Sequence, residues 1–252
     1  MKKFGIIAVI MMMASAVWSQ EFKVPKSTGR LELRIGRVTV EGYTGNEIIF
    51  TSNDVKREKD KRAEGLRAIS GSGLEDNTGL GINVTTKGDI IAVEQLARTN
   101  SPDIKVKVPK GVIVSYDYTS QHSSNVRFMN MSNEIEVSAN YNSVELENVT
   151  GPLTVKSVYG HVEALFTNDI KGPISIISIY GYVDVTMPVT TKADLRLNTS
   201  YGEIFASPEF KIDFDTSTGG SRKGDKVVGK LNGGGISMDF TCNYGKVYLR
   251  KK

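Results

Sequence analysis

The chain has 252 residues and nearly balanced charge, with 32 Lys or Arg against 28 Asp or Glu residues. This balance does not favour nucleic-acid binding, which usually accompanies a concentrated basic face. A single cysteine excludes an internal disulfide bond in a secreted protein.

The first 19 residues predict a secretory signal peptide. Lys2 and Lys3 precede an apolar run over residues 4–17, and small residues follow. The run is shorter than the ~20 residues of a membrane-spanning helix, so an uncleaved anchor is the weaker alternative. We expect cleavage after Ser19 and export to the periplasm, the outer membrane or the extracellular space. The remaining residues, 20–252, are expected to form one elongated domain with no transmembrane segment.

Residues 20–125 predict an irregular N-terminal part that contains short strands and a β-hairpin. Residues 54–62 carry a mixed-charge run that predicts either one exposed helical stretch or a flexible segment within residues 52–79. The strand patterns, with alternating apolar residues, cover residues 31–35, 38–40, 47–50, 103–109 and 112–118, and a hairpin around residues 87–89 joins 80–84 to 90–94.

Residues 126–252 contain an internal repeat marked by the dipeptide Tyr-Gly. The dipeptide begins at Tyr159, Tyr180, Tyr201 and Tyr244, and a weaker copy begins at Tyr141. A period of about 20 residues is typical of a solenoid, and short strands of period 2 lie on both sides of each Tyr-Gly turn. The sequence therefore predicts an all-β fold, a single-stranded parallel β-solenoid or β-helix with coils of about 18–21 residues.

Equivalent residues of successive coils should form ladders about 4.8 Å apart. The four tyrosines of the dipeptides are expected to stack, with their hydroxyl groups at the surface. The glycine after each tyrosine is expected to adopt a positive φ at a tight corner.

The same alignment predicts that Cys242 is a small buried residue, because it falls in a ladder with Ser157, Ser178 and Thr199. A reactive or pairing thiol is the alternative.

Residues 207–235 interrupt the count between the last two Tyr-Gly coils. A Gly- and Ser-rich stretch over residues 216–225 predicts a surface loop. The rest could supply one degenerate coil with Phe210, Ile212 and Phe214 directed inward. The basic residues 250–252 are expected to discourage end-to-end association of an exposed last strand.

The order of these motifs resembles the bacterial putative adhesin family, a group of secreted β-strand-repeat proteins catalogued as a domain of unknown function. The motifs that carry the resemblance lie at residues 36–43, 76–81 and 105–109, in the Ser-x-Tyr-Gly-x-Val coils, and at 231–236 and 244–251. The resemblance implies a secreted or envelope-associated repetitive β protein, and it assigns no catalytic residues.

We therefore predict a non-enzymatic adhesin-like, binding or structural module of the bacterial envelope. Tyr182, Phe205 and Tyr248 are predicted to point outward and to offer a binding face for carbohydrate or protein at the cell surface. Loops within residues 56–66 and 215–226 are predicted to add variable contacts.

Two other functions remain open at this stage. Glu134, Glu136, Glu145 and Glu147 could serve a glycan-active enzyme built on a β-helix, although a solvated strand face is favoured. An envelope-signalling accessory protein is the second alternative.

No metal, cofactor or nucleic-acid partner is predicted. His122 and His161 have no neighbouring ligand at metal-binding spacing and are interpreted as solvent-facing. Residues 213–217 show alternating oxygen donors but lack the glycine and the final acidic residue of a calcium loop.

Overall fold

The computed structural model describes residues 21–52, 62, 64–66, 69–122, 124–167, 170–215 and 225–252. The signal-peptide prediction, nearly all of the charged run and most of the Gly- and Ser-rich loop lie outside these residues. Within the described chain, 21 strands form two β-sheets without an α-helix, as the all-β prediction required. No described segment forms an apolar helix long enough to cross a membrane.

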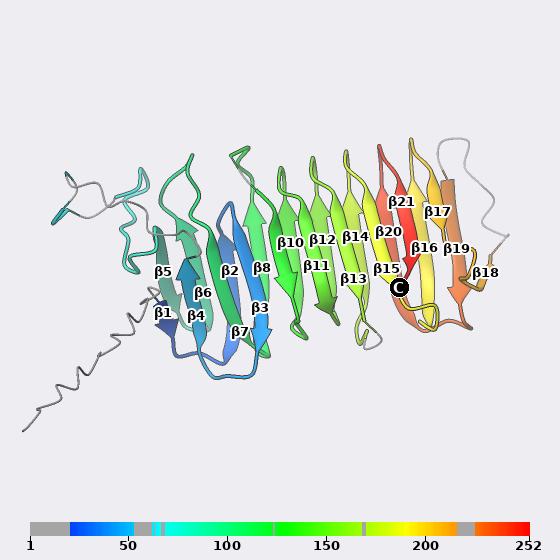
Figure 1. Ribbon diagram of the computed structural model, residues 1–252, viewed down its shortest axis with the longest axis horizontal. Coiled ribbons are helices and arrows are strands. Elements are labelled where there is room, and N and C mark those ends of the chain that lie inside the picture. The colour runs from blue at the N-terminus through cyan, green and yellow to red at the C-terminus, as the bar shows by residue number, and fades with distance from the viewer. Residues whose placement is uncertain are drawn as a thin grey trace, which may run out of the picture.

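The two sheets lie face to face along an elongated molecule (Figure 1). Together they form a solenoid-like fold in which most neighbouring strands are parallel. The ten-stranded sheet has the spatial order β1 (Glu21–Val24), β4 (Ile48–Ser52), β7 (Ile104–Pro109), β3 (Val38–Tyr43), β9 (Val126–Met129), β11 (Val144–Val149), β13 (Val162–Phe166), β15 (Val183–Met187), β21 (Val247–Lys251) and β17 (Ile204–Ala206). The eleven-stranded sheet has the order β18 (Ile212–Phe214), β19 (Asp225–Leu231), β16 (Ala193–Thr199), β20 (Ile236–Cys242), β14 (Ile174–Ser178), β12 (Leu153–Ser157), β10 (Ile135–Ala139), β8 (Gly111–Tyr118), β2 (Thr28–Arg34), β6 (Ile90–Gln95) and β5 (Ile82–Lys87).

The core lies between the sheets and follows from the alternation of apolar residues along each strand. Val137 faces Val155 in the parallel register, and Val155 faces Ile176 in the next strand. All three side chains are buried, because every second residue of a strand points to the same side of its sheet. Burying one such side chain stabilises the fold by about 1.5–3 kcal/mol relative to leaving it in water.

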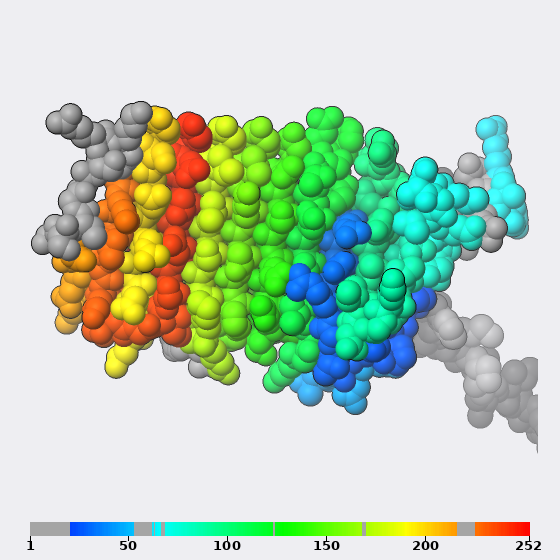
Figure 2. Space-filling model, turned by 180° about the vertical axis from the view of Figure 1, so that it is seen from behind, coloured from blue at the N-terminus to red at the C-terminus, as the bar shows by residue number. Residues whose placement is uncertain are grey.

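The spatial order of the C-terminal coils differs from their order in the chain. β20 pairs with β14 on one side and with β16 on the other, and β21 likewise lies between β15 and β17. Figure 2 shows the coil of β20 and β21 as a red stripe between yellow and yellow-green strands. The last strand of the chain is therefore not at the end of the stack, and the prediction that it is exposed there is wrong.

The N-terminal end shows the same arrangement. β2 lies between β6 and β8, and β3 lies between β7 and β9. The first coil in the chain is thus placed one position inside the end of the stack, as the last coil is. Antiparallel strands complete both ends, and the predicted hairpin of β5 and β6 is among them.

The predicted stacking of the tyrosines is confirmed, and Tyr141 joins the row. We define the tyrosine ladder as Tyr141, Tyr159, Tyr180, Tyr244 and Tyr201, in spatial order. Neighbouring ring centroids are 5.0 or 5.1 Å apart with interplanar angles of 9–16°. All five side chains are exposed, so the ladder follows one corner of the molecule.

The glycines of the Tyr-Gly turns are required for a different reason than the one predicted. None of the four has a positive φ. A Cβ on Gly181 would instead lie 2.3 Å from the carbonyl oxygen of Gly160, and one on Gly245 would lie 1.9 Å from that of Gly181. The coils therefore approach each other too closely at this corner for any side chain.

Cys242 is buried, as predicted, in the ladder that also contains Ser178 and Thr199. Ser178 donates a hydrogen bond to the carbonyl oxygen of Gly160 at 3.0 Å, and the thiol of Cys242 donates to that of Gly181 at 3.3 Å. Burial raises the pKa of this thiol. The structure supports the buried interpretation over a reactive thiol.

The segment after β17 does not form a degenerate coil. β18 pairs with β19 in the antiparallel sense, and β19 pairs with β16. Phe210 is buried, whereas Phe214 lies on the inner side of its sheet, as predicted, but keeps 62% of its surface exposed because no described strand faces β18. The basic residues 250–252 do not protect an edge either, because β21 is an interior strand.

Candidate functional site

The outer face of the ten-stranded sheet gathers the predicted binding residues at its C-terminal half. Tyr182 directly precedes β15, Tyr248 lies in β21, and Phe205 lies in β17. Their side chains point away from the core because the alternate residues, such as Val183 and Val247, are buried. The register places Tyr248 beside Phe205, so the structure brings the predicted residues together.

These residues form a continuous row with His161, which we call the aromatic strip (His161, Tyr182, Tyr248 and Phe205). The His161 ring stacks on Tyr182 with centroids 4.5 Å apart and an interplanar angle of 6°. Tyr182 meets Tyr248 edge-on at 6.3 Å, and Tyr248 stacks on Phe205 at 5.6 Å. The interpretation of His161 as a merely solvent-facing residue missed this contact, although its alignment with Tyr182 in the repeat was visible in the sequence.

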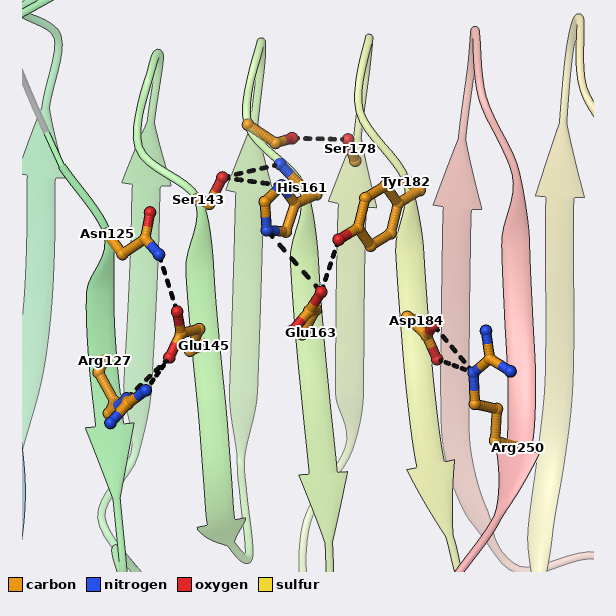
Figure 3. Close-up of polar contacts among 11 residues, drawn as sticks. Asn125, Arg127, Ser143, Glu145, His161, Glu163, Ser178, Tyr182, Asp184 and Arg250 are labelled. Atoms are coloured by element: carbon orange, nitrogen blue, oxygen red, sulfur yellow. Dashed lines mark hydrogen bonds and ion pairs between the residues drawn. The ribbon is translucent and has the colours of Figure 1, made fainter.

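Polar contacts fix the orientation of the first two members of the aromatic strip (Figure 3). The hydroxyl group of Tyr182 donates a hydrogen bond to Glu163 at 2.5 Å. The Nδ1 atom of His161 lies 2.9 Å from the hydroxyl oxygen of Ser143, and its Nε2 atom lies 3.9 Å from Glu163. Burial, together with the hydrogen bond to the Glu163 carboxylate, raises the pKa of Tyr182 to about 12. The phenol therefore stays protonated and remains a hydrogen-bond donor at neutral pH.

Cationic side chains lie over the other two rings. The guanidinium group of Arg250 is 5.0 Å from the ring centroid of Tyr248, and its Nε atom donates to both carboxylate oxygens of Asp184 at 2.8 and 2.9 Å. The ammonium group of Lys246 is 5.3 Å from the ring centroid of Phe205. Such cation–π contacts contribute about 0.5–1 kcal/mol at exposed sites and so favour the observed ring orientations.

The surface around the aromatic strip is shallow. One hollow of about 360 Å³ lies over β9, β11, β13 and β15, and charged side chains border it at Arg127, Glu145, Glu163, Asp184 and Arg250. A second hollow of about 400 Å³ includes Phe205 and Tyr248. An open face of this kind suits a large ligand that lies across several strands, because small-molecule sites usually enclose most of the ligand surface.

The four glutamates of the enzymatic alternative do not meet. Glu134 and Glu136 line a hollow on the outer face of the eleven-stranded sheet, whereas Glu145 and Glu147 lie on the outer face of the ten-stranded sheet. The core separates the two pairs, and stacked sheets are about 10 Å apart before the outward side chains are counted. The four residues therefore do not form one site together.

Two of these glutamates are also engaged by cations. Glu145 accepts hydrogen bonds from Asn125 at 2.8 Å and from the Nε atom of Arg127 at 2.7 Å. Glu136 pairs with Arg30, and the hydrogen bond from this guanidinium lowers the pKa of the Glu136 carboxyl group. A general acid needs a raised carboxyl pKa, so the environment of Glu136 opposes that role.

The described residues contain no group of three His, Cys, Asp or Glu side chains placed to hold a metal ion. His122 is exposed, and its backbone N–H donates to the hydroxyl oxygen of Ser120 at 3.2 Å. Of the disfavoured calcium segment, Asp213 and Asp215 are described, whereas residues 216–217 lie outside the described chain.

Comparison with known proteins agrees with the family resemblance. A family model described as Toastrack DUF4097 matches residues 122–230. Residues 122–230 are therefore similar to the Toastrack DUF4097 family. This match confirms the resemblance predicted from the order of the motifs, and the Toastrack region includes the strands from β9 to β18 and most of β19.

Two crystal structures are similar to this chain. A putative cell adhesion protein from Clostridium sporogenes is 10% identical, with a TM-score of 0.46, over 93% of this chain and 100% of that protein. A putative adhesin from Bacteroides fragilis is 12% identical, with a TM-score of 0.43, over 92% of this chain and 96% of that protein. No curated protein sequence matches the chain.

Proposed function

We propose that this protein is an exported, non-enzymatic binding module of the bacterial envelope, and that the aromatic strip contacts its ligand. The ligand is a carbohydrate or a protein at the cell surface. The aromatic strip carries the proposal, because it places four ring systems in one outward row on a sheet whose inner face is fully occupied by the core.

The chemistry of the aromatic strip supports binding of an extended ligand. Aromatic rings supply apolar contact area, and the hydroxyl group of a tyrosine adds a polar contact at little cost in conformational entropy. Each ring belongs to a different coil, so a ligand that runs along the stack meets a new ring at each step. The pairs Arg250–Asp184 and Lys246–Glu203 border the row and offer charged contacts to polar groups of the ligand.

The division of the carboxylates supports a non-enzymatic role. A glycosidase needs two carboxyl groups within about 5–10 Å on either side of one glycosidic bond. Glu136 and Glu145 lie on opposite outer faces instead. The hydrolase alternative would have to rely on Glu134 with Glu136 or on Glu145 with Glu147.

The proposal includes the domain organisation expected from the sequence. Residues 1–19 are the signal peptide, and residues 20–252 form a single-stranded parallel β-solenoid with coils of about 18–21 residues. Regular coils from residue 126 onward follow an irregular N-terminal part, and residues 207–235 form an excursion from the stack.

Retention on envelope material tests the binding proposal. Purified protein is passed over isolated cell envelopes, envelope polysaccharide and matrix proteins in separate columns. The variant with Tyr182→Ser and Tyr248→Ser should lose at least tenfold in affinity for the retaining material. A variant with Tyr141→Ser and Tyr159→Ser removes the same number of rings from the tyrosine ladder and should bind normally. Equal binding of both variants, or hydrolysis of the polysaccharide by the native protein, would contradict the proposal.

Cell fractionation tests the exported location separately. When the full chain is expressed, the protein should appear in the envelope or medium without residues 1–19. Protease treatment of intact cells should then show whether it is outside the cell. A protein that stays in the cytoplasm with residues 1–19 attached would rule out an envelope function.

A further inference from the structure

The two sheets end unequally at the C-terminal end of the stack. The ten-stranded sheet ends at β17, which forms one coil with β16. The eleven-stranded sheet continues beyond β16 with β19 and β18, which form an overhang without a facing strand in the described chain (Figure 1). The molecule therefore has a step two strands wide at this end.

The step exposes apolar side chains. Phe214 pairs with Gly229 of β19, and Gly229 pairs with Leu195 of β16, whose side chain lies in the core. Phe214 therefore lies on the inner side of the sheet. Ile212 belongs to the same inner side and is only partly buried, as is Ile204 in β17. Phe210 fills part of the space, but Phe214 remains 62% exposed and Phe205 44% exposed.

The edge strand β17 is short but carries none of the charged residues that commonly protect a sheet edge. Exposed edges commonly carry charged residues that prevent pairing with another chain. β17 reads Ile-Phe-Ala and contains no charge. At the N-terminal end, by contrast, the edge strand β1 presents Glu21 and Lys23, which form an ion pair at 3.4 Å.

We propose that two copies of this chain join at their C-terminal ends, with β17 of each copy pairing with β18 of the other. β18 is antiparallel to β19, and β19 is antiparallel to β16. β18 therefore runs in the direction of β16 and opposite to β17. A two-fold axis parallel to the strands then makes both new pairs antiparallel.

A second copy is the occupant that fits the step, because each overhang supplies the strands that the other copy lacks. One joined sheet has the order β16, β19 and β18 of the first copy, followed by β17 of the second copy. The facing sheet has β17 of the first copy, followed by β18, β19 and β16 of the second copy. Every strand then faces a strand, and no edge is left free at the joint. Such a closed two-fold contact gives a dimer and not a filament.

The side chains match in this arrangement. Both edge strands have three residues. Pairing Phe205 with Asp213 places Ile204 beside Phe214 and Ala206 beside Ile212, so apolar residues meet on the inner side. Because the axis exchanges front and back, the two aromatic strips would face opposite sides of the dimer.

The mass of the protein in solution tests the joint. Sedimentation equilibrium of the native full chain should give twice the monomer mass. Phe214→Lys should weaken dimerisation at least tenfold, because it places a charge on the inner side of the joint, and the exposed site makes misfolding a small risk. Leu66→Lys, at another exposed apolar residue away from the joint, should leave the dimer intact. A monomer at all concentrations, or an open series of larger species, would overturn the proposal.

Disulfide cross-linking tests the register. The variant with Phe205→Cys and Asp213→Cys should form a covalent dimer on mild oxidation, because directly opposite residues of an antiparallel pair have the Cα separation of a disulfide. Within one chain the two positions lie on different sheets, and Cys242 is buried. Each single variant is the control. Cross-linking by Phe205→Cys alone would show that β17 meets β17, and no cross-link in the double variant would exclude the joint.

Discussion

The thiol of Cys242 donates a hydrogen bond to the carbonyl oxygen of Gly181, as the hydroxyl group of Ser178 does to that of Gly160. Cys242 and Ser178 lie opposite each other in the parallel register of β20 and β14. A cysteine and a serine thus perform the same task in adjacent coils. The ladder needs a small donor at this position and does not need a thiol in particular.

Replacement of Cys242 follows from this equivalence. Cys242→Ser keeps a donor of similar size, so we expect its free energy of unfolding to stay within about 1 kcal/mol of the native value. Cys242→Val removes the donor and leaves the Gly181 carbonyl without this hydrogen bond, which should cost about 1–3 kcal/mol. Urea unfolding of the three proteins measures both effects. If the valine variant were the more stable of the two, the hydrogen-bond ladder would not contribute as described.

The close approach of the coils makes Gly181 sensitive to the smallest side chain. Gly181→Ala would place its Cβ 2.3 Å from a backbone oxygen, so the coils must separate, and we expect a loss of about 1–3 kcal/mol or more. Gly71 has no heavy atom within 4 Å of its added Cβ and no positive φ. Gly71→Ala should therefore be neutral or slightly stabilising. Equal thermal midpoints for the two variants would contradict this account.

The position of a ring within the tyrosine ladder sets its contribution to stability. Tyr180 stacks on two neighbours, whereas Tyr141 stacks on one. Each stacked pair contributes about 0.5–1.5 kcal/mol, so Tyr180→Ala should cost about twice as much as Tyr141→Ala. Their exposed fractions are similar, which makes the comparison a matched one. Urea denaturation can resolve the difference, and equal losses would show that the stacking adds little.

The ion pair between Arg30 and Glu136 predicts a dependence of stability on pH. The hydrogen bond from Arg30 lowers the pKa of Glu136, so the folded protein binds this proton less readily than the unfolded chain does. The stabilisation is complete above the ordinary glutamate pKa and is lost as the pH falls through the lowered pKa.

Glu136→Gln tests this dependence. The native protein should be the more stable of the two near neutral pH, and the difference should shrink toward about pH 3. Glu134→Gln, in the same hollow, is the control, because it removes one carboxylate and leaves the hydrogen bond between Arg30 and Glu136 in place. A difference that stays constant over this range would show that Glu136 does not gain its stabilisation from its charge.

The repeat in the sequence predicted the strands, the stacked tyrosines and the burial of Cys242, because these depend on residue type and on spacing within one coil. It could not predict which coil lies beside which. Ser178, Cys242 and Thr199 occupy equivalent places and fit one another equally well, so alignment of the repeats is silent about their spatial order. β19 pairs with the outer side of β16, and β20 takes the side of β16 toward β14.

The candidate site was predicted only in part. Alternation along a strand showed that Tyr182, Tyr248 and Phe205 point outward. The register places Phe205 beside Tyr248, whereas Asp184 is the residue opposite Tyr248 and Tyr182 reaches that ring diagonally. Alternation does not say which of the two sheets a strand joins, so it could not show that Glu136 and Glu145 lie on opposite outer faces. The corner glycines were misread because a positive φ and a close backbone contact both exclude side chains, and the sequence cannot separate the two causes.

The interior position of β20 and β21 matters for a chain that is still being synthesised. The ribosome makes β16 and β17 before these strands, yet β16 and β17 have no direct pairing with β14 and β15 in the described chain. Until residues 236–251 emerge, the coil of Tyr201 cannot pair with the growing stack, because β20 and β21 occupy the position between them. The Toastrack region can therefore assemble coil by coil only as far as β15, and its remainder must wait for the final strands.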